Sequence, residues 1–146
     1  MEEVSTINEL KSAVERRINA ALDKDIPEYL IQRIKEHQRT DVLSTYRPVE
    51  YKRRKDGLGN DDNFKVKRTK NTVTVMDVTK IEGPRLTEYN PQSETDLAKI
   101  IENGAYNPWN NNSYVWTGPR PYMTNTQNYI NEHPKTIKTL ILRQFR

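Results

Sequence analysis

The stretch FKVKRTKNTVTVMDV, residues 64–78, decides the fold class of this chain. Apolar and polar side chains alternate along both of its halves, and a period of two residues is typical of a half-buried strand. The two halves meet at the polar pair Lys70 and Asn71, which favours a tight reversal of the chain. We therefore predict a β-hairpin. One set of alternating positions consists of Phe64, Val66, Arg68, Val73, Val75 and Asp77, and the other of Lys65, Lys67, Thr69, Thr72, Thr74, Met76 and Val78.

Upstream of the hairpin, apolar residues recur at spacings of three and four, which predicts an amphipathic helix with one buried stripe. Thr6 and Glu9 have the spacing of a capping box at its start. Pro27 interrupts the pattern, because proline lacks an amide hydrogen and disfavours helical geometry in the residue before it. We predict two helical pieces up to about Ser44, with one kinked helix as the alternative. The stripe consists of Ile7, Leu10, Val14, Ile18, Ala21, Leu22, Leu30, Ile31, Ile34, Gln38 and Val42.

Downstream of the hairpin, Ser93 and Asp96 form a second capping-box pair, and Gly104 stands where a left-handed residue commonly ends a helix. A short helix is predicted between them. The asparagine run 110–112 is a polar turn signal, and one short strand fits near residues 114–117.

The last segment divides at Pro134, with helical spacing before it over residues 123–130 and again after it over residues 137–145. A strand at residues 139–145 is the alternative for the second part. Together these elements predict an α+β fold: a small antiparallel β-sheet with a β-hairpin, packed by a long N-terminal helix and shorter C-terminal helices. We expect residues 1–146 to form a single domain.

Composition limits both the core and the chemistry of the chain. Only 34% of its residues are hydrophobic and 30% are charged, so the core is small and neighbouring subunits would help to order its loops. The absence of cysteine excludes disulfides, thiol nucleophiles and cysteine-ligated metals. His37 and His133 lie in no catalytic or metal-binding motif and are predicted to be surface residues. We expect a soluble protein with no enzyme activity, no cofactor and no membrane partner.

Residues 46–63 form the predicted contact surface. They have no apolar periodicity, which predicts an irregular loop, and loops beyond roughly 12–15 residues in a compact domain are usually functional or disordered. Residues 46–70 hold nine Lys/Arg and four Asp/Glu, whereas the rest of the chain has 15 basic and 16 acidic residues. The mixture of basic residues with Tyr46 and Tyr51 could track a nucleic-acid backbone and stack bases. We favour a solvated loop or a protein contact anchored by Arg and Tyr, because the four acids weaken a phosphate-binding field.

Three stretches resemble the tail-completion, or minor tail component, family of long-tailed bacteriophages. In the first, the N-terminal helix leads into YRPVEYKRR, residues 46–54, followed by Gly57 and Leu58, similar to the family's aromatic-proline, tyrosine-basic and glycine-leucine sequence. The second, LAKIIENG at residues 97–104, looks like its short helix ending in glycine. The third, PRPYM at residues 119–123, looks like its arginine-proline-aromatic turn, with tyrosine where phenylalanine is more usual.

The resemblance implies a structural virion protein, made in the host cytoplasm, that completes the tail and joins it to the capsid connector at the head–tail junction. It further implies a ring, expected to be a hexamer, through which DNA passes without sequence-specific binding. Its partners would be copies of itself, connector or stopper proteins, and tail tube or tail terminator proteins. The alternative is a sequence-nonspecific nucleic-acid-binding protein that uses residues 46–70. The predicted interface residues are Tyr46, Pro48, Tyr51, Arg53, Arg54, Arg120 and Tyr122.

Overall fold

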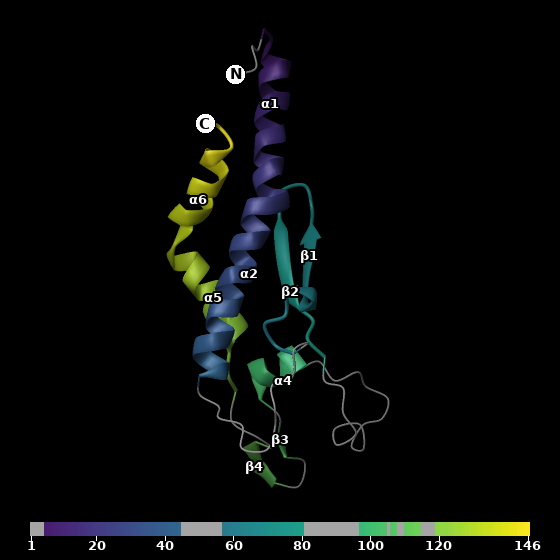
Figure 1. Cartoon of the computed structure of the whole chain (residues 1–146), viewed down its shortest axis with the longest axis vertical. Coiled ribbons are helices and arrows are strands. Elements are labelled where there is room, and N and C mark those ends of the chain that lie inside the picture. The colour runs from purple at the N-terminus through teal and green to yellow at the C-terminus, as the bar shows by residue number, and fades with distance from the viewer. Residues whose placement is uncertain (1–4, 45–56, 81–96, 105, 108–109, 115–118) are drawn as a thin grey trace.

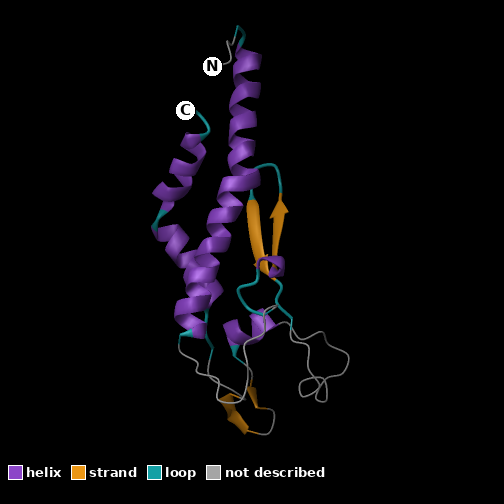
Figure 2. Cartoon of the chain, in the orientation of Figure 1, coloured by secondary structure: helices purple, strands orange, loops and turns teal. Residues whose placement is uncertain are grey.

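A computed structural model of the chain describes residues 5–44, 57–80, 97–104, 106–107, 110–114 and 119–146. A long helical rod forms its axis, with a β-hairpin on one side and the C-terminal helices on the other (Figure 1). The start of the rod and the end of the last helix lie at the same end of the molecule. Helices and strands both contribute, as Figure 2 shows, and the predicted α+β class is confirmed.

The rod begins with helix α1, Ile7–Ala20, and its predicted capping box is confirmed. The Glu9 amide donates to Thr6 Oγ1 at 3.2 Å, and the Thr6 amide donates to the Glu9 carboxylate at 3.1 Å. Hydrogen bonds from Ser5 and then from Thr6 lower the pKa of Glu9. These bonds satisfy amides that have no partner inside the helix, which fixes where α1 begins.

The rod continues past Pro27 without a break. A π-helical turn at Ala21–Asp25 leads into helix α2, Ile26–His37, and a second π-helical turn occupies Gln38–Leu43. Pro27 falls in the first turn of α2, where a missing amide hydrogen costs little. The two predicted helical pieces are therefore joined into one rod, because the π-helical turn before Pro27 keeps the helix continuous.

Strands β1, Phe64–Arg68, and β2, Val73–Asp77, form the predicted antiparallel hairpin. Phe64 lies opposite Asp77, and the turn is closed by a 2.9 Å hydrogen bond from the Thr69 amide to the Thr72 carbonyl. The alternation is kept along β2, where Val75 and Asp77 are buried while Thr74 and Met76 are exposed. In β1 only Phe64 is buried, and the expectation for Val66 was wrong, since its side chain is 46% exposed.

Helix α4, Leu97–Asn103, ends at Gly104, whose φ of +74° confirms the predicted left-handed stop. Its predicted capping pair at Ser93 and Asp96 lies outside the described residues. A second antiparallel pair follows, β3 at Tyr106–Asn107 and β4 at Asn110–Tyr114.

The asparagine run is therefore part of a strand, and its interpretation as a turn was wrong. Asn110 pairs with Asn107 of β3, and strand propensity depends strongly on such context. Of the strand predicted near residues 114–117, only Tyr114 lies among the described residues, and it ends β4.

The chain closes with helices α5, Tyr122–Glu132, and α6, Pro134–Arg143. The alternative strand at residues 139–145 is wrong, because Pro134 starts a new helix at a position where its missing amide hydrogen is not needed. The core lies where α2 and the second π-helical turn meet the hairpin, α4 and α5. Its buried apolar members are Ile34, Val42, Phe64, Val75, Ala98 and Tyr122.

Candidate functional site

Five of the predicted interface residues lie outside the described part of the chain: Tyr46, Pro48, Tyr51, Arg53 and Arg54. Of the predicted loop, the structure describes only residues 57–63, which include the short 3-10 turn Asp61–Asn63. The roles assigned to those five side chains therefore stay predictions.

Arg120 joins three elements just before α5. Its amide donates to the Ile101 carbonyl at 2.8 Å, and its Nη1 donates to the Val42 carbonyl at 3.3 Å. The residue is half-buried. Arg120 thus binds α4 and the end of the rod to the segment that starts α5.

Glu102 completes this junction by capping α5. Its carboxylate accepts the Met123 amide at 2.8 Å and the Thr124 amide at 3.0 Å. A carboxylate at a helix N-terminus satisfies unpaired amides and interacts favourably with the helix dipole. Two of the stretches that carry the family resemblance, 97–104 and 119–123, are therefore in direct contact. The sequence identified each of these two stretches, but it did not predict that they are in contact.

Tyr122 lies inside the chain, with 0% of its surface exposed. Its hydroxyl donates to Asp77 Oδ2 at 2.7 Å, which ties α5 to β2. Burial, and then the neighbouring Asp77 carboxylate, raise the pKa of the Tyr122 hydroxyl above its ordinary value. This side chain offers no surface to a partner in the described structure, and it fixes the C-terminal helix from within. Phenylalanine at this position would lack the bond to Asp77.

Asp77 is the centre of a buried polar cluster, which we call the Asp77 cluster: Gln38, Asp77, Thr79 and Tyr122. Gln38 Nε2 donates to Asp77 Oδ2 at 2.6 Å, and the Thr79 amide donates to Oδ1 at 3.0 Å. The Thr79 hydroxyl donates to the same oxygen. Both carboxylate oxygens are thus satisfied, which a buried carboxylate requires.

The sequence contained the signal for this cluster. Gln38 occupies the apolar stripe of the rod, and Asp77 occupies an inward position of β2. A polar side chain at an inward position needs a hydrogen-bond partner in the core. Gln38 and Asp77 therefore each indicated a second buried polar residue. The hydrogen bonds of the cluster hold the rod, hairpin and α5 together.

A second polar cluster lies between α2 and α5. Arg33 sits 4.8 Å above the ring centroid of Tyr129, and His133 stacks on the same ring at 4.1 Å. His37 meets Tyr129 edge-on at 6.1 Å and lies 3.1 Å from Asp41 Oδ2. The prediction of a surface residue is confirmed for His133, but His37 is half-buried because α5 packs over it.

Asp41 links this second cluster to Asn125 of α5, whose Nδ2 donates to Asp41 Oδ2 at 3.0 Å. Burial raises the pKa of Asp41, but the hydrogen bonds from Asn125, Thr40 and His37 outweigh it, and the net effect is a lowered pKa. Among the described residues no group of three or more His, Asp or Glu side chains could hold a metal ion. The contacts observed here are helix-to-helix contacts.

Large apolar side chains are exposed at the start of α1 and at the end of the chain. Ile7 and Leu10 were predicted to be buried, but they are 85% and 53% exposed, because α1 extends beyond the other elements (Figure 1). Leu142 and Phe145, at the end of α6, are 51% and 37% exposed. We call these four side chains the apolar end.

Two contacts attach the C-terminal end of the chain to the rod, one of them through Phe145 of the apolar end. Gln144 Nε2 donates to Asp25 Oδ2 at 2.7 Å, and the Arg17 guanidinium lies 5.5 Å from the ring centroid of Phe145. The first turns of α1 lie beyond these contacts (Figure 1). No described element covers them.

Comparison with known protein families shows the family to which this chain belongs. A family model described as YomN matches residues 6–143, which is nearly the whole chain. The chain belongs to the YomN family. The YomN name is that of a phage-derived Bacillus protein, so the chain is phage-related. The YomN match spans the rod, both hairpins and the C-terminal helices.

Neither the curated proteins nor the solved structures contain a match to this chain. Within the described ranges, none of the helices combines the length and the apolar character that crossing a bilayer would require.

Proposed function

We propose that this chain is a structural, non-enzymatic virion protein at the head–tail junction of a long-tailed phage. It completes the tail end and joins it to the capsid connector. It assembles as a ring, a hexamer in this proposal, around a lumen for DNA. Its partners are copies of itself, connector or stopper proteins, and tail tube or tail terminator proteins.

The apolar end is the observation that carries this proposal. Single exposed hydrophobic residues are ordinary, but Ile7 and Leu10 lie on successive turns of a helix that extends beyond the body of the protein. Fully burying one such side chain contributes about 1.5–3 kcal/mol. A neighbouring subunit that covers both would therefore gain more than one weak contact.

The contact between residues 97–104 and 119–123 also supports the proposal. Glu102 caps α5, and the Ile101 carbonyl accepts the Arg120 amide, so the two stretches form one structural unit. Stretches that resemble the tail-completion family in sequence and also pack together favour a shared architecture. The phage-related YomN family agrees with this role.

Charging the apolar end tests the proposal. The double variant Ile7→Asp, Leu10→Asp should lose ring formation and head–tail joining, because an interface would have to bury two carboxylates. The matched control is Asn8→Asp, Ser12→Asp, which adds the same charge to exposed positions of the same helix. Native mass spectrometry measures the oligomer, and electron microscopy of complemented phage counts tailed particles. Circular dichroism should show both variants folded.

Two results would contradict the proposal. One is the absence of the wild-type chain from purified particles. The other is equal ring formation and equal numbers of joined particles for the two double variants.

The predicted loop has its own part in this proposal. Arg53 and Arg54 pair with acidic partner surfaces, and Tyr46 and Tyr51 supply anchoring area. The double variant Arg53→Ala, Arg54→Ala should keep its circular dichroism spectrum and weaken assembly. Unchanged ring formation and head–tail joining would remove the two arginines from the interface.

A further inference from the structure

We infer that the outer face of the β1–β2 hairpin is the surface that contacts the phosphate backbone of duplex DNA. We call it the hairpin lysine face, and it consists of Lys65 and Lys67 of β1 and Lys70 of the turn. The inference deepens the proposed function by naming the surface that meets DNA, and it rests on that function for the place where DNA is met.

The strand register puts the lysines on one face. Lys65 lies opposite Met76, and Lys67 lies opposite Thr74, so these four side chains share the face that points away from the core. All four are exposed. Same-face residues of a strand lie about 7 Å apart, so Lys65 and Lys67 form a short row, and Lys70 lies beyond it in the exposed turn.

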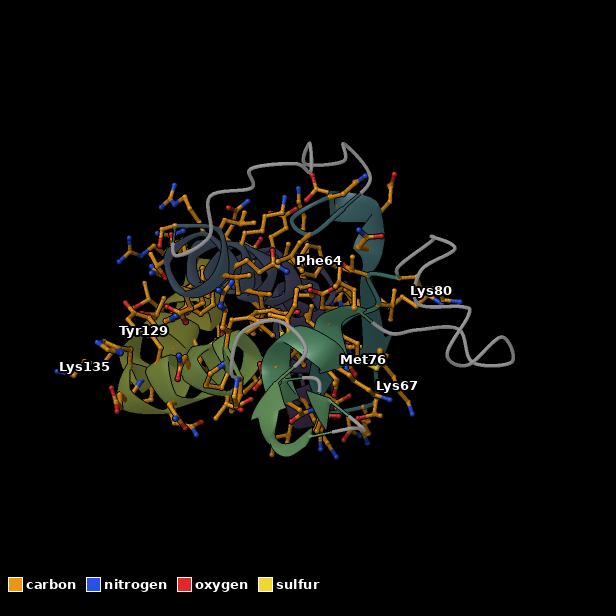
Figure 3. The ribbon with its side chains drawn as sticks, turned by 90° about the horizontal axis from the view of Figure 1, so that it is seen from below. Phe64, Lys67, Met76, Lys80, Tyr129 and Lys135 are labelled. Carbon is orange, nitrogen blue, oxygen red and sulfur yellow. The ribbon has the colours of Figure 1, made fainter. Side chains whose placement is uncertain are left out.

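Figure 3 shows the direction of this face. Lys67, Met76 and Lys80 project from one side of the molecule, and Tyr129 and Lys135 lie on the opposite side. Lys80, which follows β2, is also exposed. The hairpin lysine face is therefore directed away from the helices α5 and α6.

The three lysines differ from other basic residues in how their charge is balanced. Arg33 pairs with Glu36 at 2.6 Å, Arg68 Nε pairs with Asp23 at 3.0 Å, and Lys35 pairs with Asp61. The lysines of the face form no ion pair with any carboxylate in the described ranges.

The carboxylates near the hairpin do not neutralise this face. Asp61 and Asp62 precede β1, and Asp61 forms an ion pair with Lys35. Asp77 lies on the inner face of β2 and is buried. Among the residues that the structure describes, no ion pair balances the positive charge of the hairpin lysine face.

The composition of the face favours nucleic acid over protein as the partner. Protein interfaces are depleted of lysine and enriched in aromatic residues, methionine and arginine, whereas this face presents lysines and a threonine beside the single methionine Met76. A lysine ammonium binds phosphate as a point charge and needs no fixed geometry. A two-stranded ribbon also fits the major groove of duplex DNA, which is about 12 Å wide.

The hairpin presents these lysines from a fixed platform. Arg68 Nε donates to Asp23 Oδ1 at 3.0 Å, and its Nη2 donates to Asn19 Oδ1 at 2.8 Å, which ties the hairpin to the rod. Phe64 and Val75 anchor the inner face in the core. Because the hairpin backbone is already ordered, binding costs the rotamer freedom of the lysine side chains but no ordering of the backbone.

A salt series on the purified full-length protein tests the inference. The probe is a fluorescein-labelled duplex DNA of mixed sequence, and anisotropy gives Kd at each salt concentration. The variant Lys65→Gln, Lys67→Gln should bind more weakly, and its slope of log K against log[salt] should fall by about 2, since each phosphate contact contributes about 0.9. The matched control Lys135→Gln, Lys138→Gln removes the same charge from α6 and should keep the wild-type slope.

Three outcomes would overturn the inference: wild-type binding with a flat salt response, an equal fall in slope for both variants, or binding to phosphatidylserine vesicles with none to DNA. Particle assays separate it from the proposed function. Joined particles with a hairpin variant that binds DNA normally would remove only the DNA surface. A chain that binds DNA through the hairpin but is absent from particles would remove only the head–tail role.

Discussion

The middle of the molecule and the end of its rod differ in the burial of their side chains. In the middle, even the polar residues are enclosed, and Asp77 has hydrogen-bond donors on both carboxylate oxygens. At the end, apolar residues such as Ile7 lie in solvent. The difference shows that the stability of the isolated chain is concentrated in the middle. Stability measurements and assembly measurements should therefore respond to different residues.

Removing the Asp77 carboxylate should produce the largest loss of stability. Asp77→Ala leaves the Gln38 amide, the Thr79 hydroxyl and the Tyr122 hydroxyl without their acceptor, and each unsatisfied buried group costs about 1–3 kcal/mol. We expect the free energy of unfolding to fall by about 3 kcal/mol or more, measured by urea denaturation.

The control for this prediction is Asp61→Ala. That carboxylate is exposed and paired with Lys35, and a surface pair contributes only about 0.2–1 kcal/mol. Asp77→Asn keeps the shape of the side chain and remains measurable where the alanine variant does not fold. Equal effects of Asp77→Ala and Asp61→Ala would mean that the Asp77 cluster does not hold the middle together.

Removing the Tyr122 hydroxyl should have a smaller effect that depends on pH. Hydrogen bonds to charged groups contribute about 1.5–3 kcal/mol, so Tyr122→Phe should lose about 2 kcal/mol at neutral pH. The folded-state pKa of Tyr122 lies above its unfolded value near 10. Its stabilisation is therefore complete below about pH 10 and is lost as the pH rises beyond that.

Urea midpoints measured from neutral to alkaline pH check this second prediction. The wild-type chain should lose stability above about pH 10 more steeply than Tyr122→Phe. Tyr129→Phe controls for tyrosine ionisation outside the Asp77 cluster. Parallel alkaline curves for the wild type and Tyr122→Phe would count against the bond to Asp77.

The Asp41 carboxylate should contribute about 1 kcal/mol, with the opposite pH dependence. Its folded-state pKa is lowered, so its stabilisation is present above the unfolded value near 3.9 and is lost as the pH falls through the folded value. Asp41→Asn should flatten the acid limb of the stability curve. Asp62→Asn, at an exposed site, is the control, and the same flattening in both variants would contradict this assignment.

The smallest expected effect is at the apolar end. Leu142→Ala should change the free energy of unfolding by less than about 0.5 kcal/mol, because the side chain is already half exposed. The same substitution at Leu30, which packs against the core, should cost about 2 kcal/mol. Chemical denaturation of the two variants side by side provides the measurement. An equal loss at both positions would erase the distinction between the middle and the end.

Much of the fold could be predicted because local chemistry determines it. The Thr6–Glu9 capping box, the alternation around Lys70 and Asn71, and the stop at Gly104 each need only neighbouring residues. The helix at residues 134–143 was left open against a strand because short apolar runs fit both periods. The pairing of β3 with β4 was missed because the asparagine run has weak strand propensity.

The candidate site was less predictable, because it depends on contacts between distant residues. Periodicity identified Ile7 and Leu10 as apolar-face residues, but it cannot tell whether the covering surface belongs to the same chain. Tyr122 was predicted to be an interface residue, yet its side chain is buried against Asp77, a residue 45 positions away in the chain. The likeness of residues 97–104 and 119–123 to one family did not predict the cap formed by Glu102.

The π-helical turns at Ala21–Asp25 and Gln38–Leu43 have a geometric consequence for the rod. Each π turn holds about one residue more than an α turn, and one residue corresponds to about 100° of rotation around a helix axis. The side chains after the first turn are therefore rotated relative to those before it. The apolar stripe of α2, which packs against the hairpin and α5, is therefore out of phase with the stripe of α1. A single continuous helix can in this way address two different sets of neighbours.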